Sequence, residues 1–346
     1  MAKSFKHYLG APKRRLKLYW GSAEELGYKG FAKAKVALDI WWWHKIHHYK
    51  PESYVFYGFN KYKSSYRKLF LDDYDQYITY NRFNGAFRFG KGGQYEDFGK
   101  DIINRDWIYV DKSGIEAVKD FIAKNEKVIF KPNRGSCGKG VFVVSAKDSA
   151  AAIEKEILSV SGKDYLCEQF IAQHPALSAL HADSVNSIRV LVLNDHGNIK
   201  VIAATLKIGS GKNVVDNLRN GGCAANINVE NGIVDTPFAD LDGKNIFFSV
   251  NGIGALGFQI PNWDKVLEIA KKATLICKGN VVLGFDIAVT EDGAALIEAN
   301  NRPGTRIVQS FDKKPKGELI RGYCKKYKKE LKKIPKRKNR RHKSLS

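Results

Sequence analysis

The stretch VVLGFDIAVTEDGAALIEANNRPG, residues 281–304, carries the clearest structural pattern in the chain. Two mostly apolar runs flank the turn-forming sequence EDG at 291–293, which predicts two antiparallel strands in a hairpin. With a three-residue turn and its glycine in the left-handed conformation, Thr290 pairs with Ala294. This pairing sets the expected register of the whole hairpin.

The expected register gathers three oxygen-bearing side chains on one face of the hairpin. Asp286 falls directly opposite Glu298, with Cβ atoms about 4.5–5.5 Å apart. Because strand side chains alternate, Asn300 shares the face of Glu298. The opposite, apolar face is expected to hold Phe285, Ile287, Ala295 and Ile297. A slip of one residue would move Asp286 to that apolar face.

The two opposed carboxylates indicate a nearby cation, because like charges across strands repel and burial adds a desolvation penalty. Mg²⁺ suits the site, since it binds carboxylate and amide oxygens and keeps open positions for phosphate oxygens. The alternative is a carboxylate that faces solvent or pairs with Lys or Arg. The spacing on a hairpin favours the metal, and we predict Asp286, Glu298 and Asn300 as its ligands.

A glycine-rich turn follows Lys131 at the end of a predicted strand, in the sequence PNRGSCGKGV. Glycines let the backbone approach a polyphosphate and offer N–H groups to it, while lysines add charge. The predicted phosphate-binding residues are Lys131, Gly135, Ser136, Gly138, Lys139 and Gly140. The sequence is not a P-loop, because GK[ST] and a following helix are both missing. A hairpin turn without a ligand is the alternative for this loop taken alone.

Two further segments have residues suited to a nucleotide. Glu168, Gln169, Phe170 and Ile171 lie where a predicted strand leaves its sheet, and an edge strand can offer backbone groups to adenine. The alternative is an ordinary strand end. In SVNSIRV, residues 184–190, Asn186 could bind ribose hydroxyls, and Arg189 could bind a γ-phosphate or a substrate carboxylate.

Charge and composition limit the class of protein. The chain has 346 residues, 44% of them hydrophobic, which is enough for two or three modules and excludes dominant disorder. The net charge of +22 lies mainly at the ends: residues 1–20 have six Lys/Arg and no acid, and residues 321–346 have thirteen and one acid. The remainder is nearly neutral, so a nucleic-acid partner is disfavoured.

Other features favour the cytoplasm. Five cysteines without a CxxC pair fit neither a disulfide framework nor a zinc site. No stretch approaches the roughly 18 unbroken apolar residues of a membrane span, and the N-terminus lacks a secretory apolar region. The basic tail is expected to be solvated, and an anionic inner membrane face is the alternative partner for it.

The chain divides into four predicted regions. Residues 1–105 are a mostly helical region, and 19 of the 41 aromatic residues fall within 41–98. These rings are expected to form its core, with stacked bases as the alternative. Residues 106–180 and 181–320 are expected to be two α+β subdomains with mostly antiparallel sheets, followed by the basic tail at 321–346.

In this order and spacing, KPNRGSCGKGV, EQFI, SVNSIRV and LGFDIAVTEDGAALIEANNRPG resemble the ATP-grasp superfamily, and residues 106–312 resemble its sugar-transfer-associated family. The resemblance implies ATP between two subdomains, with Mg²⁺ on the hairpin. It implies a carboxylate–amine ligase that forms an acyl phosphate and then an amide. By the same resemblance, Arg189, Lys207 and Arg302 are expected to stabilise the acyl phosphate.

The resemblance has two departures and leaves the substrates open. Members carry an earlier lysine, for which Arg82, Arg88, Lys91 and Lys100 are the candidates here. They also carry an arginine two residues before the first metal carboxylate, where this chain has Gly284. The family name suggests an amino acid and a sugar acid, free or glycan-linked, in surface polysaccharide synthesis. The alternatives are a kinase acting on a hydroxyl and a non-catalytic binder of anionic polymers through the tail.

Overall fold

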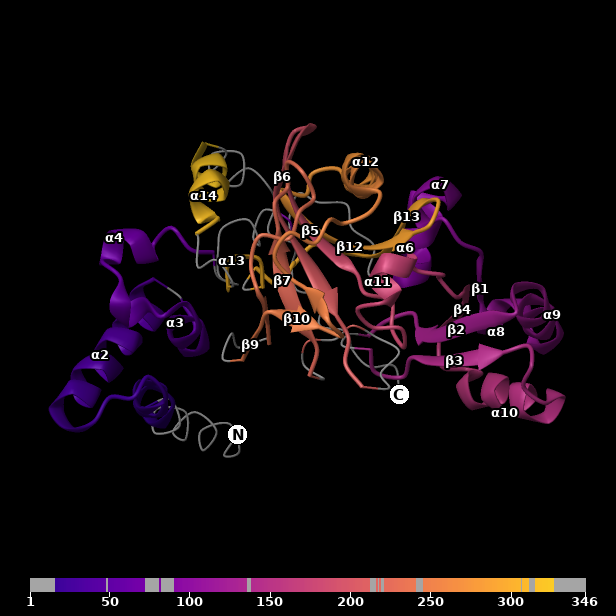
Figure 1. The fold of residues 1–346 in the computed structure, drawn as a ribbon, viewed down its shortest axis with the longest axis horizontal. Helices are drawn as coiled ribbons and strands as arrows, with labels where there is room; N and C mark the ends of the chain where they lie inside the picture. The colour runs from indigo at the N-terminus through magenta and orange to yellow at the C-terminus, as the bar shows by residue number, and fades with distance from the viewer. Residues whose placement is uncertain are drawn as a thin grey trace, which may run out of the picture.

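The computed structural model describes residues 16–47, 49–71, 81, 90–135, 138–211, 216, 218, 221–240, 245–305, 307–310 and 315–326. N-terminal helices lie on one side, a seven-stranded sheet lies in the centre, and a four-stranded sheet lies on the other side (Figure 1). The pairings within both sheets are antiparallel. The predicted α+β class is therefore confirmed. Residues 327–346 of the basic tail lie outside the described residues.

The N-terminal module consists of short helices packed through aromatic rings, as predicted. Its elements are the helical residues 16–25, α2 (Gly30–Ile46), α3 (Pro51–Tyr57), the 3₁₀ helix η1 (Phe59–Lys61) and α4 (Ser64–Arg67). Its core contains Tyr19, Trp43, Tyr49, Tyr54, Tyr57, Phe59 and Phe70. The side-chain amide of Gln309 ties the module to the rest of the chain, through the backbone N–H of Leu71 and the hydroxyl of Tyr57.

The small sheet has the strand order β1-β4-β2-β3. Its strands are β1 (Trp107–Tyr109), β2 (Lys127–Pro132), β3 (Phe142–Ser145) and β4 (Tyr165–Gln169), and helices α8 (Val110–Ser113), α9 (Ile115–Asn125) and α10 (Ala150–Val160) accompany it. Ser149 caps α10, as its residue type predicts. The expectation that the strand ending at Gln169 is an edge strand is wrong, because β4 lies between β1 and β2.

The large sheet has the order β13-β12-β5-β6-β7-β8-β9. Its strands are β5 (Ile188–Asp195), β6 (Asn198–Ile208), β7 (Cys223–Ile227), β8 (Phe238–Ala239), β9 (Ile246–Phe247), β12 (Val282–Thr290) and β13 (Gly293–Asn300); β10 (Ser249–Val250) and β11 (Ile253–Gly254) form a separate pair. The helices around it are α6 (Lys91–Phe98), α7 (Lys100–Ile103), α11 (Pro175–Ser178), α12 (Trp263–Ile276), α13 (Ile307–Ser310) and α14 (Gly317–Lys326).

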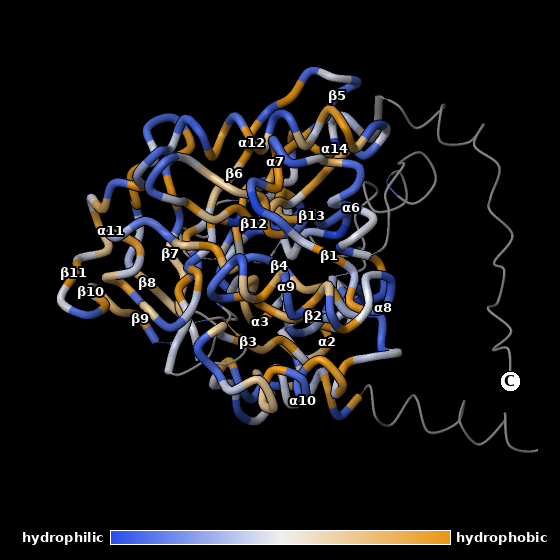
Figure 2. The backbone as a smooth tube through the Cα atoms, turned by 90° about the vertical axis from the view of Figure 1, so that its right-hand side faces the viewer, coloured by the Kyte–Doolittle hydropathy of each residue, from blue (hydrophilic) through white to orange (hydrophobic). Residues whose placement is uncertain are grey.

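The two faces of the large sheet belong to different cores. One face packs with α6, α7 and α12 in the central cluster, and the other packs with α13 and α14. β12 and β13 therefore lie near the middle of the molecule (Figure 2). By packing, α6 and α7 join this central core rather than the N-terminal module, and Tyr323 of α14 is buried although it lies within the predicted tail.

The β12–β13 hairpin has the predicted pairing at its functional end but a different turn. Thr290 pairs with Gly293, so the turn has two residues rather than three. A bulge at Ile297 then shifts the register, and Asp286 does lie opposite Glu298. Ala295 therefore lies on the other face from the one predicted, although it is fully buried, and Ile297 is the extra residue of the bulge. Leu296 and Ala299 pack in the central core instead, together with the correctly predicted Phe285 and Ile287.

Candidate functional site

Five polar side chains form a row across the large sheet, each directly opposite the next. Glu298 pairs with Asp286, and Asp286 pairs with Arg189 of β5. Arg189 pairs with Thr205 of β6, which pairs with Asn226 of β7. Cross-strand partners point to the same face of a sheet. The row therefore forms a polar strip on the face whose other end is covered by α13 and α14.

Asp286 is held by two cations. Arg189 grips it with two parallel bonds, Nε to Oδ1 at 2.5 Å and Nη2 to Oδ2 at 2.8 Å. Lys207 Nζ lies 3.4 Å from Asp286 Oδ2. Burial acts to raise the pKa of the Asp286 carboxyl, but the positive charges of Arg189 and Lys207 lower it well below its ordinary value. Asp286 therefore stays ionised.

Lys207 also contacts a second carboxylate, which was not among the predicted site residues. Asp216 Oδ2 lies 3.4 Å from Lys207 Nζ. The same oxygen accepts hydrogen bonds from the backbone N–H of Ser187 at 2.9 Å and from the Ser187 hydroxyl. The ammonium of Lys207 thus lies between two acids, Asp216 and the Asp286 of the polar row.

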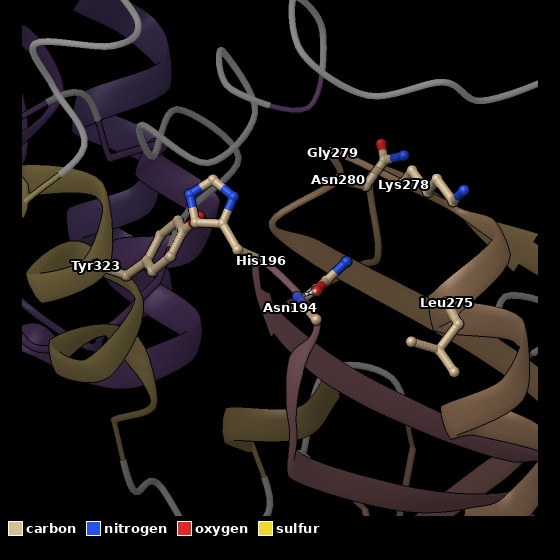
Figure 3. A pocket seen from close by; sticks show the side chains of 8 residues that line it. Asn194, His196, Leu275, Lys278, Gly279, Asn280 and Tyr323 are labelled. Atoms are coloured by element: carbon tan, nitrogen blue, oxygen red, sulfur yellow. Dashed lines mark hydrogen bonds between the residues drawn. The ribbon is translucent and has the colours of Figure 1, made fainter.

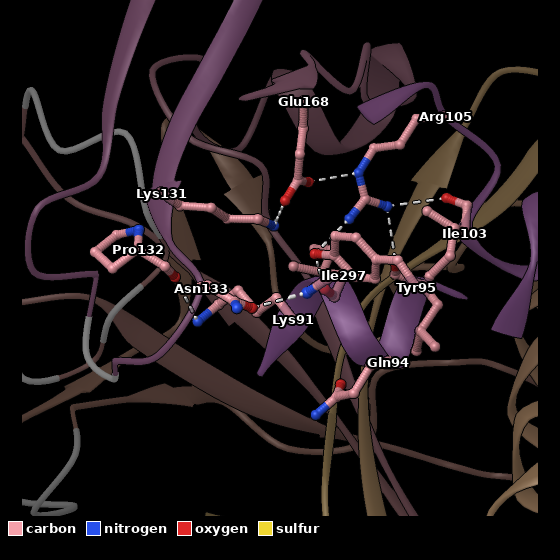
Figure 4. A network of polar contacts seen from close by, with 12 residues as sticks. Lys91, Gln94, Tyr95, Ile103, Arg105, Lys131, Pro132, Asn133, Glu168 and Ile297 are labelled. Atoms are coloured by element: carbon pink, nitrogen blue, oxygen red, sulfur yellow. Dashed lines mark hydrogen bonds and ion pairs between the residues drawn. The ribbon is translucent and has the colours of Figure 1, made fainter. Parts of the chain in front are cut away.

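A second charged cluster lies on the small sheet (Figure 4). Glu168 is 1% exposed, and its two carboxylate oxygens contact Lys131 Nζ at 2.6 Å and Arg105 Nε at 2.8 Å. Burial is the main cause that lowers the pKa of Lys131 well below its usual value, and the nearby charges of Arg105 and Lys91 lower it further. Burial and the two neighbouring cations therefore act against the charged form of Lys131, and Glu168 is the carboxylate that it contacts.

Arg105 joins this cluster to the strand that carries Glu298. Its guanidinium donates to the Leu296 carbonyl at 2.7 Å and to the Tyr95 hydroxyl at 2.8 Å, and Tyr95 donates to the Ile297 carbonyl at 2.9 Å. Burial is the main cause that raises the pKa of Tyr95 to about 12, and the Glu298 carboxylate adds to the rise. The bulge in β13 is thus held by two buried side chains from segments outside the hairpin.

Glu298 stands between the two charged clusters. Its negative charge acts to raise the pKa of Lys131 on the small sheet and of Arg189 on the large sheet, against the effect of burial on each. Both clusters therefore lie within electrostatic reach of one carboxylate. Strand β13 also connects the two clusters by contact: its Glu298 lies opposite Asp286, and its Leu296 and Ile297 carbonyls accept hydrogen bonds from Arg105 and Tyr95.

The glycine-rich turn joins β2 and β3, as predicted. Gly138 and Gly140 have φ of 68° and 73°, which favour glycine, and a Cβ on Gly140 would lie 2.5 Å from the Tyr165 hydroxyl oxygen. Gly135 and Lys139 are exposed, whereas Ser136 lies outside the described residues. The backbone of this turn is therefore open to a ligand at Gly135 and Lys139.

Lys91 is the described upstream residue that reaches the glycine-rich turn. Its Nζ lies 3.4 Å from the Pro132 carbonyl and 3.5 Å from the Gly135 carbonyl. Lys100 instead pairs with Asp106 at 2.7 Å, on the surface. The other two candidates, Arg82 and Arg88, lie outside the described residues.

Gly284 is explained by its packing. A Cβ at this position would lie 2.5 Å from Cβ of Pro303 and 3.4 Å from Cδ of Arg189. An arginine at position 284 would therefore collide with Pro303. Arg189, from the neighbouring strand, brings a guanidinium to Asp286 in its place.

The residues expected around adenine and ribose have other contacts. The backbone N–H groups of Gln169 and Phe170 donate to the Asp106 and Lys127 carbonyls, and Ile171 is half-buried beyond the end of β4. Asn186 is fully buried, and its side chain bonds to Gln173, Leu177, His181 and Gly209. Its amide is thus engaged in holding the segment before β5, so the structure gives it a structural task instead of an exposed position for a ribose.

The donor set fits Mg²⁺ shared with phosphate. Within the described ranges, no group of three or more His, Cys, Asp or Glu could hold a metal by itself. Mg²⁺ commonly binds one or two carboxylates and completes its shell with phosphate and water. Glu298 has no hydrogen bond or ion pair with another described residue, and Asn300 follows on the same face. Asp286 is paired with Arg189 and Lys207, which is the alternative that the sequence left open for this carboxylate, and it keeps acceptor positions beside them.

The lowered pKa of Asp286 predicts a pH dependence of stability. Its pKa is lower in the folded than in the unfolded chain, so protonation favours unfolding. The stabilisation should be complete well above about pH 4 and be lost as the pH falls further. Urea unfolding of the wild type and of Asp286→Asn, at pH values from neutral to below about pH 4, measures the contribution of Asp286 to the unfolding free energy. We expect the difference in unfolding free energy to narrow at low pH; a difference independent of pH would contradict the assignment.

A cavity of about 310 Å³ lies elsewhere, at the other end of the β5–β6 hairpin (Figure 3). It is lined by Asn194, His196, Gly197, Leu275, Lys278, Gly279, Asn280 and Tyr323. Asn194 is separated from Arg189 by about 17 Å of extended strand. This cavity is therefore not part of the polar row.

Arg302, the last predicted catalytic residue, is exposed just after β13.

Comparisons with known proteins agree with the sequence resemblance. Residues 102–315, more than half of the chain, match the family model described as sugar-transfer associated ATP-grasp. No curated protein matches the chain. Among solved structures, it is similar to the ATP-grasp ligase PsnB complexed with minimal precursor, Mg and ADP, with 16% identity and a TM-score of 0.39 over 70% of this chain and 59% of that one.

It is also similar to D-alanyl-alanine synthetase A from Vibrio cholerae O1 biovar eltor, with 12% identity and a TM-score of 0.41 over 70% of this chain and 62% of that one. The chain thus spans less than two thirds of the length of these two proteins. The family match covers the glycine-rich turn, the polar row and the hairpin. The chain belongs to the sugar-transfer associated ATP-grasp family and has the ATP-grasp fold.

Proposed function

We propose that this chain is an ATP-dependent ligase that joins a carboxylate to an amine through an acyl phosphate. The observation that carries the proposal is that strand β13 connects the two charged clusters: Glu298 lies opposite Asp286, and the Leu296 carbonyl accepts from Arg105, which contacts Glu168 beside Lys131. A triphosphate between the two sheets could meet cations from both sides. Family membership supports ATP as the nucleotide.

In this proposal the small sheet binds the phosphates and the base. Lys131, Lys91, Lys139 and the turn glycines contact phosphate oxygens, and Ser136 has the same expected task. The segment 168–171 lines adenine with its apolar side chains beyond the end of β4. Glu168 does not contact the nucleotide itself, because its carboxylate is buried against Lys131 and Arg105; it positions these two cations.

The large sheet holds the metal and the reacting groups. Asp286, Glu298 and Asn300 would ligate Mg²⁺, which when bound neutralises charge on the phosphate oxygens. Arg189, Lys207 and Arg302 would hold the substrate carboxylate near the γ-phosphate. Such groups act mainly by position and charge, so no general base needs to be assigned.

The proposed reaction has two steps. A carboxylate oxygen of the substrate attacks the γ-phosphorus, and ADP leaves with the bridging oxygen. The nitrogen of the neutral amine then attacks the acyl carbon, inorganic phosphate leaves with the electron pair of the broken C–O bond, and the amine loses a proton to solvent. The cations of Arg189 and Lys207 stabilise the negative charge that builds up on the acyl phosphate.

The substrate class extends this proposal. The family description suggests an amino acid and a sugar acid, and therefore a cytoplasmic role in surface polysaccharide synthesis. The acceptor would be a free or glycan-linked sugar acid. A kinase would use the same nucleotide site but would transfer the phosphoryl group to a hydroxyl.

An ADP-release assay separates the ligase from the kinase. With ATP and Mg²⁺, we expect steady ADP release only when the pooled amino acids and the pooled uronic acids are both present. Mass spectrometry should then find an amide whose mass equals that of the carboxylic acid plus the amine, minus one water. Full ADP release with an alcohol alone, together with a phosphorylated product, would instead establish the kinase.

A further inference from the structure

Helix α2 has apolar residues on both faces. Ala37, Ile40 and Trp43 are buried in the N-terminal module. The opposite face presents Phe31, Leu38, Trp42 and Ile46, which are 89%, 66%, 49% and 50% exposed. A helix that is apolar all round is normally covered on every side. The described part of the chain leaves the second face of α2 uncovered.

The exposed residues form one continuous stripe. At 3.6 residues per turn, six exposed positions fall within an arc of about 100°. We call this set the outward stripe; it consists of Phe31, Lys35, Leu38, Trp42, Lys45 and Ile46. The helix lies at the end of the molecule away from the small sheet (Figure 1), so the stripe is separate from the proposed catalytic site.

The charge of this surface is positive. Lys35 and Lys45 are exposed within the stripe. Asp39 is the acid in α2, and it is turned toward the module, where Arg67 Nη1 lies 2.6 Å from its Oδ2 and the Tyr54 hydroxyl donates to it. The strongly basic residues 1–20 lead into the helix 16–25, whose Trp20 lies under Lys33 of α2 at 5.0 Å. Lys35 and Lys45 therefore give the outward stripe its positive charge, whereas Lys33 lies on another side of the helix and is paired with Glu24 at 2.8 Å.

This combination fits one partner better than others. Interfacial helices place Trp, Phe and Leu about 5–10 Å into the boundary between headgroups and acyl chains, and their lysines contact anionic headgroups. A second copy of the chain would bring Lys35 and Lys45 against the same lysines across a two-fold axis, which is repulsive. In the described residues, no helix is long and apolar enough to cross a membrane. A helix lying in the surface needs no such length.

We propose that the outward stripe of α2 binds the surface of an anionic lipid bilayer. The apolar side chains enter the boundary region, and Lys35 and Lys45 contact phosphate headgroups. This proposal rests on the N-terminal module and not on the proposed ligase reaction. It is also distinct from attraction by the basic tail, because a tail acts through charge alone and is screened by salt.

Co-sedimentation with vesicles tests the proposal on the full chain. The vesicles contain equal amounts of phosphatidylglycerol and phosphatidylcholine, and the salt concentration is high enough to screen the tail. Two buried apolar side chains are each worth about tenfold or more in affinity, so Phe31→Glu with Trp42→Glu should weaken binding at least that much. The matched control is Leu158→Glu, an exposed apolar position on α10, which should bind like the wild type.

Further readouts separate the outcomes. Lipids brominated on the acyl chains should quench tryptophan fluorescence of the wild type, and less so in Trp42→Phe, which keeps the apolar surface. Unchanged circular dichroism should show that the exposed substitutions leave the fold intact. Equal vesicle binding by wild type and the Phe31/Trp42 variant would overturn the proposal. The proposal would also be overturned if the wild type formed a dimer that the Phe31/Trp42 variant does not form, and if the wild type did not bind vesicles. The stripe would then bind a second copy of the chain.

Discussion

Glu298→Gln is expected to lower kcat for ADP formation by about 10²–10³-fold, the usual cost of removing one charge-stabilising group from a transition state. Glutamine keeps the shape of the side chain but loses the negative charge that Mg²⁺ would bind. Because Glu298 has no ion pair or hydrogen bond with other described residues, its loss should leave the melting temperature almost unchanged. Steady-state ADP release and thermal unfolding measure the two effects.

The matched control is Glu291→Gln, an exposed residue at the turn of the same hairpin, which should keep full activity. Asp286→Ala is a poorer test, because it leaves Arg189 and Lys207 without the carboxylate they share and should destabilise the fold by about 3–5 kcal/mol. Full activity in Glu298→Gln would show that this carboxylate is not part of the reacting site.

Arg105→Met is expected to lower the free energy of unfolding by about 3–5 kcal/mol, the usual cost of removing one partner of a buried ion pair. The substitution removes a guanidinium that contacts Glu168 at 2.8 Å and donates to the carbonyls of Ile103 and Leu296. Glu168 would keep Lys131 as its remaining cation, and the bulged strand would lose one of its supports. Urea unfolding at neutral pH measures the loss.

Lys100→Met supplies the comparison for Arg105. It breaks a pair with Asp106 in which the lysine side chain is 76% exposed, so the expected cost is about 0–1 kcal/mol. A similarly small cost for Arg105→Met would mean that the buried network contributes little to joining the two sheets.

The sequence predicted the hairpin pairing through a turn that the structure does not have. A three-residue turn and a two-residue turn followed by one bulge give the same pairing of Asp286 with Glu298. Local patterning indicated the alternation and the turn residues, but nothing in it marks Ile297 as the extra residue. The bulge depends on Tyr95 and Arg105, which lie about 200 positions earlier and are therefore invisible to a local pattern.

The same reason explains what was missed in the candidate site. β1 has three residues, too few for a period to be recognised, and without it β4 looked like an edge strand. Arg105 was missed because its partner Glu168 lies 63 positions away, and Asp216 was missed because the backbone N–H that donates to it lies 29 positions earlier, at Ser187. Lys91 was one of four upstream candidates, and only its distance to Gly135 distinguishes it from Lys100. A basic residue just before a short apolar run was the one available hint of Arg105.

A crystal structure of the full chain with Mg²⁺ and a non-hydrolysable ATP analogue tests most directly whether the two sheets share one nucleotide. We expect Lys131 to contact a phosphate oxygen, and Asp286 and Glu298 to ligate metal bound to the same phosphate chain. A nucleotide bound elsewhere, for example in the cavity beside Asn194 and Tyr323, or one touching the glycine-rich turn while Glu298 points away from its phosphates, would contradict the proposed site.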